Sequence, residues 1–289
     1  MEINKPIFTI GTGRCGSTIF QNIYSHHPAV TWLSPLCDMY PKKPGLNRWL
    51  MHIIDFPGIG DFITKKIKPV ESYRFWEYYC KGFSRPFRDL TDADVTSNSK
   101  KNLIKIFERL PTKKRNRLII KITGWPRVKF LKKIFPDAKF INVIRDGRAF
   151  VNSIINIYFW KGWEGPQNWR WGMLNEEQEK RWESYNKSFI ILAAIEWEIL
   201  MDAFEIVKKS CDKSQFIEVK YEDLMADPIK IFKEVVDFSE LEWSTNFENK
   251  IKKFKLKNMN YKWQENLSKE QKDMLNEYLK PYLKKFEYI

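Results

Sequence analysis

A glycine-rich loop near the start of the chain constrains the possible folds more than any other stretch. The loop reads Gly11-Thr12-Gly13-Arg14-Cys15-Gly16-Ser17-Thr18; it follows an apolar run from Pro6 to Ile10 and precedes Ile19 to Tyr24, which is typical of a helix. A strand, a glycine-rich turn and a helix start in this order direct backbone N–H groups and the positive end of the helix dipole toward one point. The sequence therefore predicts an anion-binding site after the first strand.

One side chain separates this loop from an ordinary P-loop. Gly11 and Gly16 have the spacing of a P-loop, but the position after the second glycine, where a P-loop has lysine, holds Ser17. In nucleoside triphosphate chemistry that lysine reaches the terminal phosphates, while a carboxylate on another strand holds magnesium. The cation inside this loop is Arg14. The loop is therefore predicted to bind a phosphate-bearing donor without the usual lysine.

With its basic residue before Cys-Gly-Ser-Thr, this loop resembles the one that holds the 5′-phosphosulfate in sulfotransferases that use 3′-phosphoadenosine-5′-phosphosulfate (PAPS). The resemblance implies that the donor is bound by Gly13, Arg14, Cys15, Gly16, Ser17 and Thr18. An ordinary tight turn is the alternative that the loop alone leaves open.

A second pair of residues fits the same family. The predicted strand Lys139 to Ile144 runs into Arg145, and Ser153 lies eight positions later on the following helix. An arginine at the strand tip and a serine two turns into the helix can face the same side. In the family that it resembles, such a pair holds the 3′-phosphate of the donor. The alternative is that Arg145 pairs with Asp146 or caps a neighbouring helix.

Three further positions match the family more loosely. Lys121 lies at the carboxyl end of the predicted strand Arg117 to Ile122, at the edge where ligands bind in open α/β sheets. The resemblance implies that Lys121 bridges the sulfuryl group, with Arg14 on its other side. It also implies that Tyr221, in Tyr-Glu-Asp, lies beside the adenine, and that Lys262, next to Trp263, lies near the 3′-phosphate. Alternatively, Tyr221 only packs.

The group that accepts a proton from the acceptor is not supplied by these motifs. Thr123 stands where cytosolic members of the family carry a histidine base, and Ser34-Pro35 stands where others carry a glutamate. The nearest carboxylate, Asp38, is the candidate base, and His52 is the other candidate. Asp38 capping a turn is the alternative role.

The four cysteines predict reduced thiols. Cys15, Cys37, Cys80 and Cys211 form no C-x-x-C pair, so neither a zinc site nor a disulfide framework is indicated. A thiol at a helix N-terminus next to Arg14 is expected to have a lowered pKa. We nevertheless interpret Cys15 mainly as a small residue that fills the loop.

The order of predicted elements gives the fold class. Strands and helices alternate, which predicts a parallel β-sheet flanked by helices on both faces, as in P-loop kinases and the sulfotransferase fold. No Pro/Gly/Ser-rich linker divides residues 1–289, so one domain is expected. Helical patterns cover Leu46 to Leu110 and form one long amphipathic helix from Trp182 to Lys209. The aromatic segment 158–172 is predicted to be an ordered loop that either stacks on sugars or phenols or packs on the core.

Composition indicates a globular protein with an affinity for anions. Hydrophobic residues make up 43% of the chain and charged residues 30%, and no apolar run is long enough for a membrane span or a signal peptide. We therefore predict a soluble, cytoplasmic protein. The formal net charge of +14 favours anionic ligands. A solvated basic surface, an anionic acceptor and a membrane surface all remain explanations for the surplus.

Together these features predict a PAPS-dependent sulfotransferase that moves a sulfuryl group to a hydroxyl or amine of a small molecule or glycan, such as a carbohydrate, and releases PAP without a metal. A P-loop nucleotide kinase would share the fold but would need ATP with magnesium. A basic nucleic-acid-binding protein fits the charge, although no reading motif is present and no nucleic acid is expected. A donor-binding protein without turnover is the third alternative. The sequence leaves the acceptor and the oligomeric state open.

Overall fold

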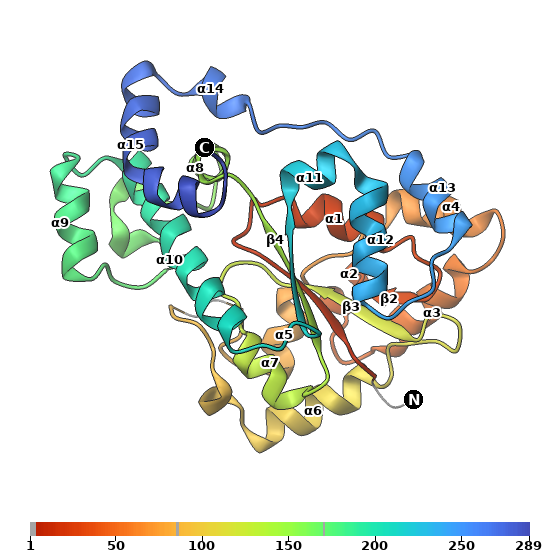
Figure 1. Ribbon diagram of the computed structural model, residues 1–289. Coiled ribbons are helices and arrows are strands. Elements are labelled where there is room, and N and C mark those ends of the chain that lie inside the picture. The colour runs from red at the N-terminus through yellow and green to blue at the C-terminus, as the bar shows by residue number, and fades with distance from the viewer. Residues whose placement is uncertain (1–3, 85–86, 170) are drawn as a thin grey trace.

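A parallel β-sheet runs through the centre of the computed structural model, which describes residues 4–84, 87–169 and 171–289 apart from the side chain of Asp61 (Figure 1). Its strands are β1 (Ile7–Ile10), β2 (Val30–Trp32), β3 (Arg117–Lys121), β4 (Lys139–Ile144) and β5 (Phe216–Lys220). Their order is β2-β3-β1-β4-β5, and each pair of neighbours is parallel. The predicted parallel sheet is confirmed.

Helices connect the strands and cover the sheet. They are α1 (Ser17–Tyr24), α2 (Pro35–Met39), α3 (Gly45–Ile54), α4 (Ile59–Lys66), α5 (Tyr73–Tyr79), α6 (Ser97–Phe107), α7 (Val128–Ile134), α8 (Gly147–Ile154), α9 (Glu176–Ser184), α10 (Phe189–Lys209), α11 (Tyr221–Ala226), α12 (Pro228–Phe238), α13 (Thr245–Lys252), α14 (Lys262–Asn266) and α15 (Lys269–Lys285). Short 3₁₀ helices are η1 (Asp92–Asp94), η2 (Gly162–Glu164) and η3 (Pro166–Asn168).

Alternating residues of the strands divide the core between the two faces of the sheet. Phe8 and its strand partner Ile120 pack in one buried cluster with residues of α5, α6 and α7. Ile7 and its partner Ile119 pack in another with residues of α1, α3 and α12. Successive side chains of a strand point to opposite faces, so near-continuous apolar strands require helices on both sides. A third cluster joins α8, α10 and α15 beyond the sheet.

The strand order brings three loops together at one edge of the sheet. β1 lies between β3 and β4, and the chain passes from one side of β1 to the other between β3 and β4. At such a switch point the loops after the strands diverge and leave a crevice for ligands. The loop after β1 stays joined to the chain after β3, because Gly124 N–H donates to the Gly11 carbonyl at 2.9 Å. The glycine-rich loop, Thr123 and Arg145 therefore share this edge.

The single long helix expected from Trp182 to Lys209 is wrong. The chain forms α9 and α10 separately, because Asn186 and Lys187 adopt left-handed backbone angles, φ 51° and 53°. Lys187 N–H donates back to the Trp182 carbonyl, and the Ser188 hydroxyl accepts from Ile190 N–H to start α10. The first half of α10, residues 190–198, is buried on all sides, whereas its second half is amphipathic, with Phe204 and Val207 buried and Asp202 and Ile206 exposed. Even so, no helix in the described ranges is both long and apolar enough to cross a membrane.

Candidate active site

The glycine-rich loop leaves the start of α1 open to an anion. Gly16 is the N-cap of α1 with φ 90°, no side chain caps the helix, and its first turn contains no acidic residue. A Cβ on Gly16 would lie 2.3 Å from the Tyr221 ring, so both the backbone angle and this contact require glycine. The first N–H groups of a helix lack partners within it and carry the positive end of its dipole. The loop therefore fits a phosphate or sulfate group.

Cys15 does not behave as the sequence suggested. Its side chain is fully buried, and burial raises the pKa of the Cys15 thiol. The expected lowering of this pKa is wrong, because desolvation of the thiolate outweighs the hydrogen bonds in the loop. The sulfur lies where a Cβ on Gly11 would come within 2.6 Å of it, so the thiol fills the interior of the loop. All four cysteines are free.

Arg145 and Ser153 both contact Arg14. An Arg145 Nη1 donates to the Arg14 carbonyl at 3.0 Å, and Arg14 Nε donates to Ser153 Oγ at 2.9 Å. The alternative pairing of Arg145 with Asp146 is not seen, since Asp146 pairs with Arg148 at 2.7 Å. Arg145 is 9% exposed, and this burial lowers its pKa. A buried guanidinium held by neutral partners is suited to an anion that supplies the opposite charge.

Asn260 completes the surroundings of Arg145 from a distant part of the chain. Arg145 Nε donates to Asn260 Oδ1 at 2.8 Å, and Asn260 Nδ2 donates to Glu222 Oε1 at 2.5 Å. Burial raises the pKa of Glu222, whose same oxygen accepts from Asp146 N–H. Sequence reasoning missed Asn260, because no spacing or motif connects it with Arg145.

Tyr221 fastens the segment before α14 onto the loop. Its ring lies against Gly16 and 4.4 Å below the Arg145 guanidinium. Its hydroxyl donates to the Lys257 carbonyl at 3.3 Å and accepts from Met259 N–H at 3.2 Å. Lys262 begins α14 just beyond this segment. Trp263 is buried, with the Arg148 guanidinium 4.6 Å from the centre of its ring.

Lys121 meets a carboxylate that the sequence did not single out. Lys121 Nζ donates to Thr18 Oγ1 at 2.9 Å and lies 3.2 Å from Glu71 Oε1. Thr123 Oγ1 lies 3.1 Å from both Glu71 oxygens and donates to them, which fixes the orientation of the carboxylate. The Glu71 side chain is 20% exposed and that of Lys121 8%, so the carboxylate is the more open of the two groups.

Glu71 reaches the sheet edge through the segment between α4 and α5. Val70 N–H donates to the Leu33 carbonyl at 2.9 Å, so this segment runs beside the chain that leaves β2. The carboxylate thus lies next to the position, after the second strand, where the sequence lacked the expected glutamate. The sequence signal is weak, because Glu71 stands in a stretch without a motif and nothing local connects it with Leu33.

Asp38, the candidate base from the sequence, has a different contact. Its Oδ1 accepts from Arg74 N–H at 2.9 Å and so caps the start of α5. Capping an N-terminal N–H is an ordinary role for aspartate. His52 is exposed on α3. Of the residues that the structure describes, neither Asp38 nor His52 lines the cavity at the loop, and Glu71 does.

A cavity of about 910 Å³ opens from the loop into an aromatic region. Thr12, Arg14 and Thr18 line it at the loop. The aromatic side chains that line it are Tyr73, Trp125, Tyr158, Phe159, Trp160, Trp169 and Trp171. The rings of segment 158–172 that the structure describes pack on the core and also form part of the cavity wall, and their stacking on a sugar or a phenol stays a prediction. Trp160 Nε1, for example, donates to Glu196 Oε2 at 2.7 Å while the ring faces the cavity.

Arg127 and Asp89 support one wall of this cavity. Arg127 is buried, and its guanidinium donates to the carbonyls of Thr123 and Trp125. Asp89 Oδ1 accepts from Arg127 N–H at 2.7 Å. Burial raises the pKa of Asp89 to about 6, because desolvation of the carboxylate outweighs the hydrogen bond and the charge of Arg127, which lower it.

This pKa predicts a pH dependence of folding. A carboxyl whose pKa is raised in the folded state makes the free energy of unfolding fall as pH rises from about 4 to about 6, and then level off. Because Asp89 is partly exposed, the total fall should be about 1–2 kcal/mol. Asp89→Asn keeps an oxygen for Arg127 N–H and should remove this slope. Urea unfolding of both proteins across this pH range measures it, and equal slopes would contradict the assignment.

Comparison with known proteins gives a consistent result. The model of a family described as the sulfotransferase family matches residues 6–245. Among solved structures, the sulfotransferase STF9 from Mycobacterium avium aligns at 15% identity and TM-score 0.62, over 99% of this chain and 77% of that one. The sulfotransferase STF1 from Mycobacterium tuberculosis H37Rv aligns at 16% identity and TM-score 0.53, over 96% and 76%. A comparison with curated proteins found no match.

Proposed function

The chain belongs to the sulfotransferase family and so is a sulfuryl-transfer enzyme, and we propose that it moves the sulfuryl group of PAPS to a hydroxyl held in the aromatic cavity. The observation that carries this proposal is the contact of Lys121 with both Thr18, at the start of α1, and Glu71, at the cavity. A cation for the leaving group and a carboxylate for the acceptor thus stand side by side.

The donor half of the site is supported by charge and by the uncapped helix. The N–H groups after Gly16 would hold the 5′-phosphosulfate, with Ser17 and Thr18 beside them. Arg145 and Ser153 would hold the 3′-phosphate next to Arg14, and Tyr221 would lie near the adenine. Lys262 would also lie near the 3′-phosphate, and Asn260 would orient the Arg145 guanidinium.

In the acceptor part of the site, Lys121, Glu71 and Thr123 have different roles in the transfer. The donor, when bound, supplies the sulfuryl group, whose bond to the bridging phosphate oxygen breaks as a bond to the acceptor oxygen forms. Lys121 Nζ stabilises the charge that develops on that bridging oxygen, together with the helix N–H groups. A Glu71 oxygen accepts the proton of the acceptor hydroxyl. Thr123 holds this carboxylate in place, and we prefer Glu71 to Asp38 because Asp38 caps α5.

The cavity wall favours an acceptor with a flat ring. Trp125 and Trp171 lie with ring centres 6.3 Å apart, and both line the cavity. Aromatic rings of this kind stack on phenols and on the apolar faces of sugars. We therefore propose a hydroxyl on a phenolic or sugar ring as the acceptor group.

We expect Arg145→Ala to weaken donor binding about 10- to 100-fold, because a charge-assisted hydrogen bond contributes roughly 1.5–3 kcal/mol. Calorimetry with PAP and with its 3′-dephosphorylated analogue measures the effect, which should be much smaller for the analogue. Arg148→Ala is a matched control, because Arg148 lies three residues further on, in the first turn of α8, but pairs with Asp146. Equal losses for both nucleotides would refute the assignment of Arg145 to the 3′-phosphate.

A transfer assay tests the proposed function itself. The protein is incubated with radiolabelled PAPS and a panel of phenols, glycans, lipids and peptides, with and without EDTA. Labelled product should form on ring hydroxyls and should not depend on the chelator. Labelling of an acceptor in a parallel incubation with radiolabelled ATP and magnesium would favour the kinase. Tight PAP binding with no labelled product on any acceptor would favour a donor-binding protein.

A further inference from the structure

An apolar surface lies on α3 and α4, at the end of the molecule opposite α9 (Figure 1). It consists of Trp49, Phe56, Ile59 and Phe62, hereafter the α3–α4 surface, whose exposed fractions are 61%, 60%, 52% and 60%. Exposed apolar residues scattered singly are ordinary, but large ones that gather on adjoining elements mark an interaction site. α3 and α4 adjoin each other in the fold.

These side chains are not displaced core residues. α3 already packs on the sheet through Leu50, Met51 and Ile54, which are buried. Trp49 stands on the opposite side of the same helix, and Phe56 continues that side past its end. In α4, Ile59 and Phe62 share a face through their spacing of three residues, while Thr64 is buried. α3 and α4 therefore each bury one side and expose apolar residues on another. Among the described residues, nothing in the chain covers this exposed apolar side.

The stretch of chain that carries this face has an excess of positive charge. Residues 42–68 contain six lysines and arginines, Lys42, Lys43, Arg48, Lys65, Lys66 and Lys68, against two aspartates, Asp55 and Asp61. Lys65 and Lys66 are exposed, and Lys66 Nζ lies 4.7 Å from the centre of the Phe62 ring.

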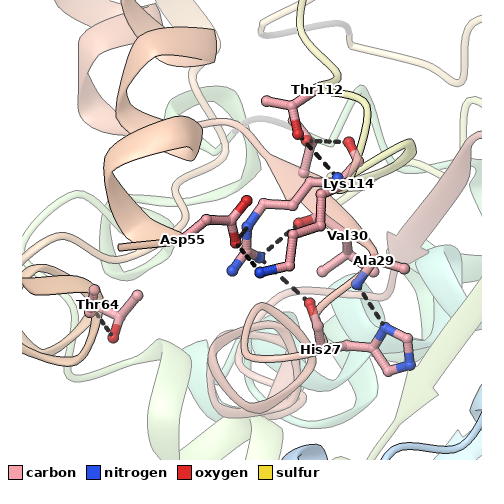
Figure 2. Close-up of polar contacts among 10 residues, drawn as sticks. His27, Ala29, Val30, Asp55, Thr64, Thr112 and Lys114 are labelled. Atoms are coloured by element: carbon pink, nitrogen blue, oxygen red, sulfur yellow. Dashed lines mark hydrogen bonds and ion pairs between the residues drawn. The ribbon is translucent and has the colours of Figure 1, made fainter. Parts of the chain in front are cut away.

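The aspartate described in this stretch is turned inward. An oxygen of Asp55 lies 3.2 Å from Lys114 Nζ and 2.9 Å from Arg115 Nε. Figure 2 labels Asp55 and Lys114. Arg115 is buried and also donates to the Val30 carbonyl, so this carboxylate anchors the end of α3 to the sheet. It is engaged in the fold and does not offset the lysines around Phe62.

We propose that the α3–α4 surface binds the surface of an anionic phospholipid bilayer. Aromatic and aliphatic side chains on one face of a helix enter the boundary between headgroups and acyl chains, and flanking lysines bind anionic headgroups. Trp49, Phe56 and Phe62 supply the first group, and the exposed Lys65 and Lys66 supply the second. This complementarity of charge favours a bilayer over a second copy of the chain, which is itself strongly basic.

Membrane binding goes beyond sulfuryl transfer and uses other residues. None of the four residues of the α3–α4 surface lines the cavity at the loop. Substitutions there should leave donor binding and transfer to a water-soluble acceptor unchanged. The proposal can therefore fail while the proposed function stands, and the reverse.

Sedimentation with vesicles tests the charge requirement. The protein should sediment with vesicles of phosphatidylcholine and phosphatidylglycerol, and far less with phosphatidylcholine alone or in high salt. Each positive charge near an anionic surface contributes about fivefold, so Lys65→Glu with Lys66→Glu should weaken partitioning by about 25-fold or more. The matched control is Lys100→Glu with Lys101→Glu, an exposed lysine pair on α6 with the same change in net charge. Equal losses in both proteins would overturn the proposal, because they would indicate attraction by net charge alone.

A second pair of variants tests the apolar requirement. Trp49→Ser with Phe62→Ser should weaken partitioning about tenfold or more, whereas Ile206→Ser, which removes an apolar side chain of similar exposure on α10, should not. In the bound state, lipids brominated on the acyl chain should quench the tryptophan fluorescence of the wild type more than that of Trp49→Ser, because the chain has 12 tryptophans and the difference reports Trp49. Sedimentation velocity without lipid tests whether a second copy of the chain binds this surface instead. A dimer of the wild type that dissociates in Trp49→Ser with Phe62→Ser would show that a second copy covers the surface, and it would overturn the proposal of bilayer binding.

Discussion

Glu71→Gln is expected to reduce turnover by about 10²–10⁴-fold while donor binding remains nearly unchanged, because a positioned base contributes about this much to proton transfer. The glutamine has the same shape and still offers an oxygen to Thr123 Oγ1, which now bonds the carboxylate at 3.1 Å. It cannot accept a proton. Initial rates with saturating PAPS and any acceptor found by the transfer assay measure the loss.

Two comparisons separate a base from a structural carboxylate. An acceptor that is already ionised, such as a nitrophenol, has no proton to give, so Glu71→Gln should retain most of its rate with it. Asp38→Asn should be nearly as active as the wild type, because the amide oxygen can still accept from Arg74 N–H. A loss that is equally large for the ionised phenol would mean that Glu71 only positions Lys121.

Lys121→Met should lower turnover by about 10²–10³-fold, which is the usual cost of losing one donor to charge that develops in the transition state. Methionine keeps most of the length of the side chain but removes the hydrogen bond to Thr18 and the ion pair with Glu71. Donor affinity should fall much less than turnover, because the contacts of Lys121 strengthen as the bridging oxygen gains charge. Rates and PAP affinity measured on the same protein give the two effects.

Lys139→Met provides the control for Lys121. Lys139 is also a buried lysine on the central sheet, on β4, but its ammonium pairs with Glu240 at the opposite end of the strands. Its replacement should affect unfolding and leave the rate per folded molecule unchanged. If Lys121→Met behaved in the same way, Lys121 would be structural.

The architecture could be predicted because local patterns determine it. Buried parallel strands are short apolar runs, and Lys139–Ile144 has the bounds that its sequence predicts. The wrong prediction of one helix across α9 and α10 also has a local cause. The apolar periodicity continues across residues 185–188, but two residues with left-handed backbone angles end the helix there. Neither Asn186 nor Lys187 is a glycine, so the sequence contains no obvious stop signal there.

The residues of the candidate site also divide into those that local patterns predict and those that they do not. Arg14 follows from the loop between β1 and α1, and Arg145 and Ser153 follow from their spacing between the end of β4 and α8; these three residues meet in the structure. Glu71 and Asn260 arrive on separate segments, held by the bond from Val70 to Leu33 and by the contacts of Tyr221. Such contacts depend on how distant segments pack, so no local pattern in the sequence predicts them. For the same reason the sequence points to Asp38, which lies close after β2 along the chain, and gives no sign of Glu71.

The contacts of Tyr221 also bear on where this protein can be cut. The family match ends at residue 245, yet the Tyr221 hydroxyl is bonded to the backbone of Lys257 and Met259, and Arg145 is bonded to Asn260. An expression fragment that stopped at the end of the match would expose the Arg145 guanidinium and strip α8 and α10 of their packing against α15. Boundaries for truncation, fusion or domain exchange therefore belong beyond Lys285, outside the last helix that these side chains hold in place.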